Sequence, residues 1–193
     1  MEAEGKPEEK ARIYPASKGG RIDHAHHYNN AYRALDETLA METALLAALA
    51  LVNPTETLIV VTSDHSHVLT MGGQATPRGH PILGPDSKVS DVDGQPYTTI
   101  LYGNGPGFAT PRIVPMNTTS AVEDRNQVHG AAVPRQWGTH GGEDVPVYAL
   151  GPLATTLFTG NVSFLISISD SGSTKIFGTQ NYIYKPNIHI INY

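Results

Sequence analysis

The sequence Thr57-Leu-Ile-Val-Val-Thr62 runs directly into Ser63-Asp64-His65-Ser66-His67. The first part is short, continuously apolar and rich in valine and isoleucine, which predicts a strand that is buried on both faces. Ligands and catalytic groups collect at the carboxyl ends of parallel strands. Aspartate and histidine, which follow this strand, supply ligand atoms that zinc accepts. These residues alone fit either a polar turn that closes a strand or one part of a metal site.

The segment before this strand has the pattern of a helix. Apolar residues recur every three or four positions from about 30 to 51, with many alanines between them. Asn29 or Asn30 can cap its start, and Asn53-Pro54 ends it, because a residue before proline avoids helical angles. A helix followed by a buried strand predicts an α/β fold. A further strand is expected at 97–102, and a last buried strand at 145–150, where Pro146 favours a position at the strand start or at a sheet edge.

The composition excludes several classes of function. The chain has 193 residues and a net charge of -5, which gives no basic surface for nucleic acid. It has no cysteine, so a zinc site would have to use histidine and carboxylate ligands. No apolar stretch is long enough to span a membrane, and residues 1–12 show no secretory signal. We therefore expect neither a nucleic-acid partner nor a membrane span.

Six of the nine histidines fall in three short clusters with acidic neighbours, of which Asp64 to His67 is one. In the first cluster, Asp23 and His27 stand four residues apart, which places both on one face of a helical turn. The alternative for this cluster is a polar helix start, where aspartate favours the positive end of the dipole. In the third, His140 precedes two glycines, which allow close approach of the backbone. The alternative there is an ordinary acidic turn.

Together the clusters predict most of a two-metal site. Two-metal phosphatases hold their ions about 3.5–4 Å apart and stabilise both the attacking and the leaving oxygen. One zinc would be held by Asp23, His27 and His140, and part of a second by Asp64 and His65.

Four motifs then resemble consecutive motifs of animal alkaline phosphatases, in the same order and with the same spacing. They are Gly19-Gly-Arg-Ile-Asp-His-Ala-His-His27, Val61-Thr-Ser-Asp-His-Ser-His67, Leu101-Tyr-Gly-Asn-Gly-Pro-Gly107 and Thr139-His-Gly-Gly-Glu-Asp144. The resemblance implies the C-terminal part of that catalytic domain over residues 19–160. Within it, a turn-rich insertion at about 70–139 resembles the family's crown, which lies near the dimer contact.

The resemblance also implies a fold and a domain organisation. The expected fold is α/β, part of a three-layer sandwich with a mostly parallel sheet and an inserted crown. Residues 1–18 are then a flexible lead-in outside the family, and residues 161–193 are a tail outside the family.

The activity that the resemblance implies is zinc-dependent hydrolysis of phosphate monoesters. In the family, one zinc activates a serine that attacks phosphorus, and the other stabilises the leaving alkoxide and then activates the water. By position, the ligands of the water-activating zinc are Asp23, His27 and His140. Asp64 and His65 match ligands of the other zinc, and His67 a second-shell position. The family is homodimeric, uses zinc and magnesium, and is secreted or lipid-anchored.

Two departures narrow the expectation for this chain. The family's Asp-Ser-Ala motif, which carries the nucleophilic serine, does not occur in the 193 residues. Lys18 stands where the family carries a glutamate that binds magnesium, and a charged ammonium cannot bind a cation. We therefore expect metal binding with little or no turnover, as in a fragment of an alkaline phosphatase. The alternatives are a non-catalytic zinc-binding or partner-binding remnant, and a different metal-dependent hydrolase of the same broad superfamily.

Overall fold

The computed structural model describes residues 16–71, 82–114, 124–160, 164–168, 174–178 and 187–192. Most of the expected lead-in, parts of the crown and much of the expected tail lie outside these residues. The described elements, in chain order, are β1 (Ala16–Lys18), α1 (Gly20–His27), α2 (Ala31–Leu49), β2 (Thr57–Thr62), β3 (Leu69–Met71), β4 (Pro85–Val89), β5 (Pro96–Thr98), β6 (Ile100–Tyr102), β7 (Tyr148–Leu150), α4 (Ala154–Leu157), β8 (Phe164–Ile168), β9 (Thr174–Gly178) and β10 (Asn187–Asn192).

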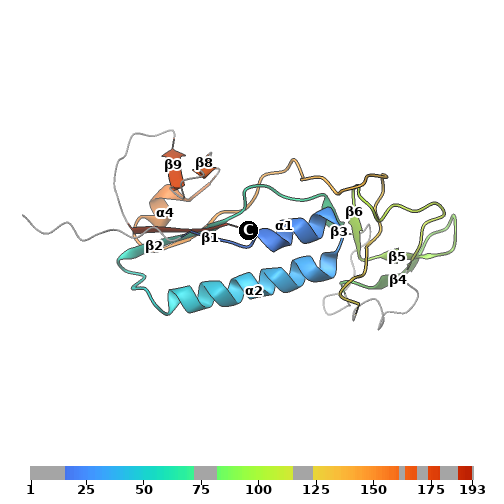
Figure 1. Cartoon of the computed structure of the whole chain (residues 1–193), viewed down its shortest axis with the longest axis horizontal. Helices are drawn as coiled ribbons and strands as arrows, with labels where there is room; N and C mark the ends of the chain where they lie inside the picture. Colours follow the sequence, from blue (N-terminus) through green and yellow to red (C-terminus); the bar gives the residue numbers. More distant parts are fainter. Residues whose placement is uncertain are drawn as a thin grey trace, which may run out of the picture.

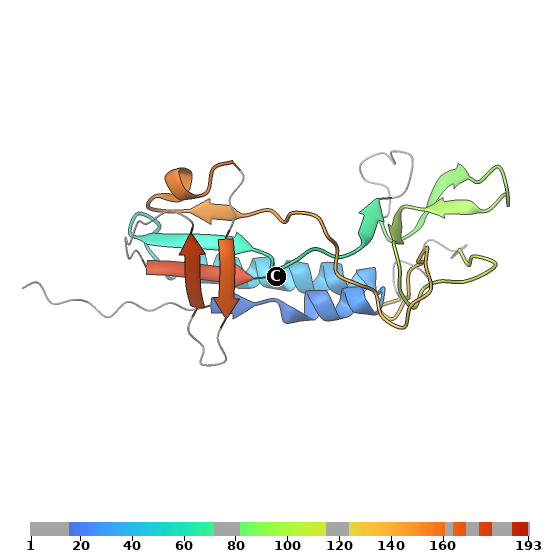
Figure 2. The same ribbon diagram turned by 90° about the horizontal axis from the view of Figure 1, so that it is seen from above.

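The largest sheet has four strands in the order β1-β10-β2-β7. Strand β10 runs parallel to both β1 and β2, whereas β7 runs antiparallel to β2 (Figure 2). The other described strands form two-stranded antiparallel sheets, β3-β6, β4-β5 and β8-β9. The fold is therefore α/β, but the described strands do not confirm a mostly parallel three-layer sandwich. The expected tail contributes β10, which lies inside the sheet.

Strand β2 is the centre of the hydrophobic core, and all six of its residues are buried, as the sequence predicts. On one face, Ile59 and Val61 pack with Ile22 of α1 and Met41 of α2. The opposite face packs Leu58 and Val60 against Ala154 of α4. Helices therefore contact both faces of this strand, and the polar residues that follow it emerge beside α1 (Figure 1).

The predicted helix is confirmed as α2, which ends at Leu49, two residues before the expected end. Its N-cap is Asn30, whose side-chain oxygen accepts a hydrogen bond from the backbone N–H of Arg33 at 2.9 Å. The preceding Asn29 has a positive φ of 53°, and this left-handed residue turns the chain sharply from α1 into α2. The turn places α1 alongside α2 (Figure 1).

Two strand predictions are wrong in their extent. The segment 97–102 forms two strands, because the chain changes partner at the buried Thr99, whose N–H bonds to the carbonyl of Gly84. Strand β5 pairs with β4, while β6 pairs with β3. The predicted buried strand at 145–150 is only β7. It lies at the sheet edge, where Tyr148 and Leu150 are exposed.

The cap of α2 gives a first prediction. Asn30→Ala should lower the free energy of unfolding by about 1 kcal/mol, because the first turn loses a side-chain acceptor. Asn30 also donates to the carbonyl of Arg125 at 2.8 Å, so Asn30→Ser, which keeps the acceptor, serves as the control. Urea unfolding should place the serine variant nearer the wild type; equal losses would assign the effect to the Arg125 contact.

Candidate metal centre

The carboxylate of Asp23 lies at the centre of a histidine cluster built from α1, the loop after β2 and residues 138–140. Its Oδ1 atom lies near the Nε2 atoms of four imidazoles, at 2.7 Å from His67, 3.2 Å from His27, 3.3 Å from His140 and 3.7 Å from His65. The rings of His65 and His140 stack with centroids 3.4 Å apart. Ligand atoms of Asp23, His65, His67 and His140 all lie within 4.8 Å of one another.

All three sequence clusters contribute to this site. Asp23 and His27 lie on one face of α1, as their spacing predicts. His67 and His140 form an isolated β-bridge, which joins the second cluster to the third. The glycine after His140 comes close to the second cluster as well, since its N–H bonds to the carbonyl of Ser66 at 2.8 Å.

The tautomers of His27 and His65 follow from their hydrogen bonds. His27 Nδ1 lies 2.6 Å from the carbonyl oxygen of Gly138, and His65 Nδ1 lies 3.1 Å from that of Ser66. A carbonyl only accepts, so each Nδ1 must carry the proton that it donates. In the neutral ring, Nε2 is then an unprotonated lone pair, and in both residues it faces the carboxylate of Asp23.

His67 is bonded differently. Its Nε2 lies 2.7 Å from Asp23 Oδ1, which is the length of a charge-assisted hydrogen bond. Its Nδ1 is buried and has no hydrogen-bond partner. In this structure His67 therefore holds the carboxylate of Asp23 in place through Nε2–H.

Asp64 lies at the edge of the cluster. Its Oδ1 is 3.7 Å from His65 Nε2, while its Oδ2 is 3.2 Å from the ammonium of Lys18. Both members of this ion pair are partly exposed, so the pair itself adds little stability. It nevertheless places a positive charge on a predicted metal ligand.

Burial and charge set the pKa values of the cluster. Burial raises the pKa of Asp23, but the His67 hydrogen bond and the nearby imidazoles outweigh it, so that this pKa lies below its usual value. Burial lowers the pKa of His67, against the opposing effect of Asp23. Burial also lowers the pKa of His26, to about 4, which leaves this ring neutral at pH 7. The site thus holds an ionised carboxylate at Asp23 beside a neutral ring at His26.

Two residues that support the site were not predicted to do so. His26 Nδ1 is 2.8 Å from the hydroxyl of the fully buried Tyr102. The side chain of Asn104 bonds twice to Thr139, the neighbour of His140. Tyr102 and Asn104 both lie in the motif at 101–107, whose sequence signals a resemblance to the family but not this supporting role.

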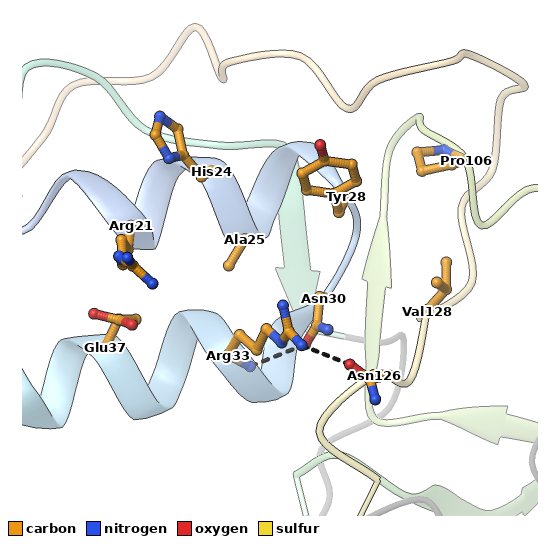
Figure 3. Close-up of a pocket in the computed structure, with 10 residues that line it drawn as sticks. All are labelled: Arg21, His24, Ala25, Tyr28, Asn30, Arg33, Glu37, Pro106, Asn126 and Val128. Atoms are coloured by element: carbon orange, nitrogen blue, oxygen red, sulfur yellow. Dashed lines mark hydrogen bonds between the residues drawn. The ribbon is translucent and has the colours of Figure 1, made fainter.

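A cavity of about 650 Å³ lies on another side of α1 and is separate from the cluster (Figure 3). Arg33 reaches across it to Asn126 Oδ1. None of the predicted ligands lines it; the lining residues are Arg21, His24, Ala25, Tyr28, Asn30, Arg33, Glu37, Pro106, Asn126 and Val128.

Comparison with known proteins identifies the family. The family model for alkaline phosphatase matches residues 11–163, and the chain belongs to the alkaline phosphatase family. It is 51% identical over 144 residues to the tissue-nonspecific isozyme of Gallus gallus, which covers 72% of this chain and 27% of that relative. It is 44% identical over 146 residues to the alkaline phosphatase of Gadus morhua, a match that covers 75% of this chain and 30% of that relative. The tissue-nonspecific isozyme of Homo sapiens is 46% identical over 141 residues, a match that covers 72% of this chain and 27% of that relative.

The chain therefore spans less than a third of the length of these relatives. Within the described residues, α2 and the shorter helices lack an apolar span that would cross a bilayer.

Proposed function

We propose that this chain binds zinc at the Asp23 cluster and supplies part of the metal centre of a phosphate monoester phosphatase. The observation that carries the proposal is the pair of carbonyl-fixed imidazoles, His27 and His65. Each has its Nε2 lone pair facing a carboxylate, and two lone pairs repel unless a cation lies between them. A backbone carbonyl on the other ring nitrogen is also the usual partner of a metal-bound histidine.

Protonation of the rings is the competing explanation for these short distances. Each imidazolium would then pair with Asp23, but one carboxylate carries only one negative charge. Four imidazoles surround it, and like charges at such separations disfavour their common protonation. A divalent cation satisfies several rings at once, so it accounts for the cluster better.

The distances support zinc and the predicted division of roles. Zinc binds histidine nitrogen at about 2.0–2.1 Å, so ligand atoms of a tetrahedral site lie about 3.3 Å apart. Asp23 Oδ1 lies 3.2 Å from His27 Nε2 and 3.3 Å from His140 Nε2, which matches that edge. The 2.7 Å contact of His67 is shorter and fits a hydrogen bond, in keeping with a second-shell role. We therefore propose Asp23, His27 and His140 as one zinc site.

We propose Asp64 and His65 as part of a second, incomplete zinc site, and phosphate monoesters as the substrate class. Zinc supplies a Lewis acid that stabilises negative charge on oxygen. The residues of this chain fix the imidazoles, hold Asp23 ionised and keep His26 neutral. The family relationship also leads us to propose a homodimer and a three-layer sandwich with a mostly parallel sheet, which the helices on both faces of β2 support.

Purified chain 1–193 provides the test of this proposal. We expect it to bind one to two zinc ions and to hydrolyse an aryl phosphate at alkaline pH far more slowly than an alkaline phosphatase, because the Asp-Ser-Ala motif is absent from its sequence. Atomic emission measures the bound zinc, and the release of phenolate measures the rate of hydrolysis. Metal-free protein after dialysis against zinc would disprove the metal site, and rapid turnover would require a different nucleophile.

A non-catalytic protein with a single metal ion is the second candidate function. The contact that favours it is the Lys18–Asp64 ion pair, which occupies a ligand of the second site. One bound zinc with no hydrolysis would support this candidate, and two bound ions would argue against it.

A further inference from the structure

We infer that Asn104 is a positioning residue that holds His140 at the metal cluster; this inference rests on the proposed zinc site. Asn104 lies in the loop after β6, and no part of it belongs to the predicted ligand set. Its side chain reaches the residue immediately before His140, 35 positions further along the chain.

The contact between Asn104 and Thr139 has two hydrogen bonds. Asn104 Nδ2 donates to Thr139 Oγ1 at 2.9 Å, and the backbone N–H of Thr139 donates to Asn104 Oδ1 at 2.8 Å. Both ends of one amide are used by one residue, so the amide fixes both its backbone and its side chain. With Thr139 fixed, the position of the imidazole depends only on the backbone and side-chain dihedral angles of His140 itself.

His140 is held on its C-terminal side by the bridge with His67 and by the Gly141 N–H that bonds to Ser66, and Asn104 holds it on the N-terminal side through Thr139. Its side chain is 48% exposed, compared with 28% for His27 and 6% for His67. Two glycines, Gly141 and Gly142, follow it, and they restrict the backbone less than any other residue would. Its ring stacks on His65, and the bonds from Asn104 to Thr139 supply the support on the side of the chain that these contacts do not reach.

The other end of Asn104 connects to α1. Its backbone carbonyl accepts a hydrogen bond from the buried Asn29 at 3.2 Å, two residues after His27. Gly138 bonds to His27 in both directions, through its N–H at 2.8 Å and its carbonyl at 2.6 Å. The loop that carries Asn104 therefore ties the end of α1 to residues 138–140, and so sets the distance from His27 to His140.

Cobalt(II) titration of the full chain tests the inference, because Co²⁺ replaces zinc and its visible absorption reports the ligands. We expect Asn104→Ala to weaken binding about 10-fold, as the loss of an outer-shell partner does, and to change the absorption band. Thr139→Val removes one of the two hydrogen bonds, and its affinity for Co²⁺ should lie between that of Asn104→Ala and that of the wild type. The same Asn104→Ala change made in His140→Ala protein should alter affinity less than twofold, because the residue it positions is gone.

Asn126→Ala is the matched control, since its side chain bonds to Arg33 away from the cluster, and it should bind as wild type does. Urea unfolding of the metal-free variants separates lost folding from lost positioning. Wild-type affinity for Asn104→Ala, or an equal loss in the His140→Ala background, would overturn the inference while leaving the zinc site intact. A wild-type chain that binds no Co²⁺ and no Zn²⁺ would instead overturn the proposed function, and the inference with it.

Discussion

Asp23→Asn should weaken zinc binding by more than about 100-fold, the largest effect expected at the cluster. The Oδ1 atom of Asp23 lies within 3.7 Å of the Nε2 atoms of all four imidazoles. The substitution keeps the shape of the side chain but removes its negative charge. Loss of an outer-shell partner alone costs about 10–100-fold in metal affinity, and loss of a central ligand should cost more. Isothermal titration with zinc measures the change.

Asp91→Asn provides the control for charge, because Asp91 is exposed and lies in the turn after β4. It should bind zinc as wild type does. Equal affinity in wild type and Asp23→Asn would mean that any bound metal uses other ligands, and the proposed centre would have to be abandoned.

Gly107→Ala should destabilise the fold by about 3 kcal/mol, the largest effect expected on stability. A Cβ at this position would overlap the carbonyl oxygen of His129 and lie 2.9 Å from its carbonyl carbon. Overpacking usually costs about 1–3 kcal/mol, and the upper end applies because the obstacle is backbone that cannot rotate away. Gly107 also donates its N–H to Asn29 Oδ1 at 3.0 Å, and any shift of the backbone weakens that bond.

Two other glycines separate the causes of this effect. Gly130→Ala meets only Leu101 Cδ1 at 3.6 Å, and should change the free energy of unfolding by less than about 0.5 kcal/mol. Gly94→Ala has open space but a φ of +68°, and should cost about 1 kcal/mol of backbone strain. Urea unfolding should therefore rank the losses in the order Gly107, Gly94, Gly130. A Gly107→Ala protein as stable as Gly130→Ala would mean that this loop can move away from His129.

The sequence predicted the parts of the fold that depend on local pattern. The apolar run of β2 requires burial wherever it lies, and the structure buries all six residues. Asn30 caps α2 because a short amide next to a helical repeat has one favourable geometry. Asp23 and His27 share a helical face through their spacing alone. In each case the interacting groups lie within a few residues of one another.

The remaining features depend on partners that are far apart in sequence. The break at Thr99 arises because its N–H bonds to Gly84, a contact that no period in the sequence indicates. The hydrogen bonds between Asn104 and Thr139 span 35 residues, and the bond between His26 and Tyr102 spans 76. Strand β10 enters the sheet from a segment with weak patterning. The assignment of metal ligands rests on the three histidine clusters and on the family resemblance, and it stays a prediction.

The group that orients His27 belongs to the main chain at Gly138, so replacing side chains one by one would never delete it. Substitutions at position 138 would instead appear harmful because of their size. An added Cβ there would come within 3.0 Å of the carbonyl oxygen of His26. A mutational survey could then attribute the effect to steric overlap at position 138, although the cause is the hydrogen bond between the Gly138 carbonyl and His27 Nδ1. Swapping the peptide bond after Gly138 for an ester weakens the carbonyl as an acceptor without adding bulk. The ester also removes the Thr139 N–H that bonds to Asn104, so the same swap in Asn104→Ala protein is the control that tells the two apart.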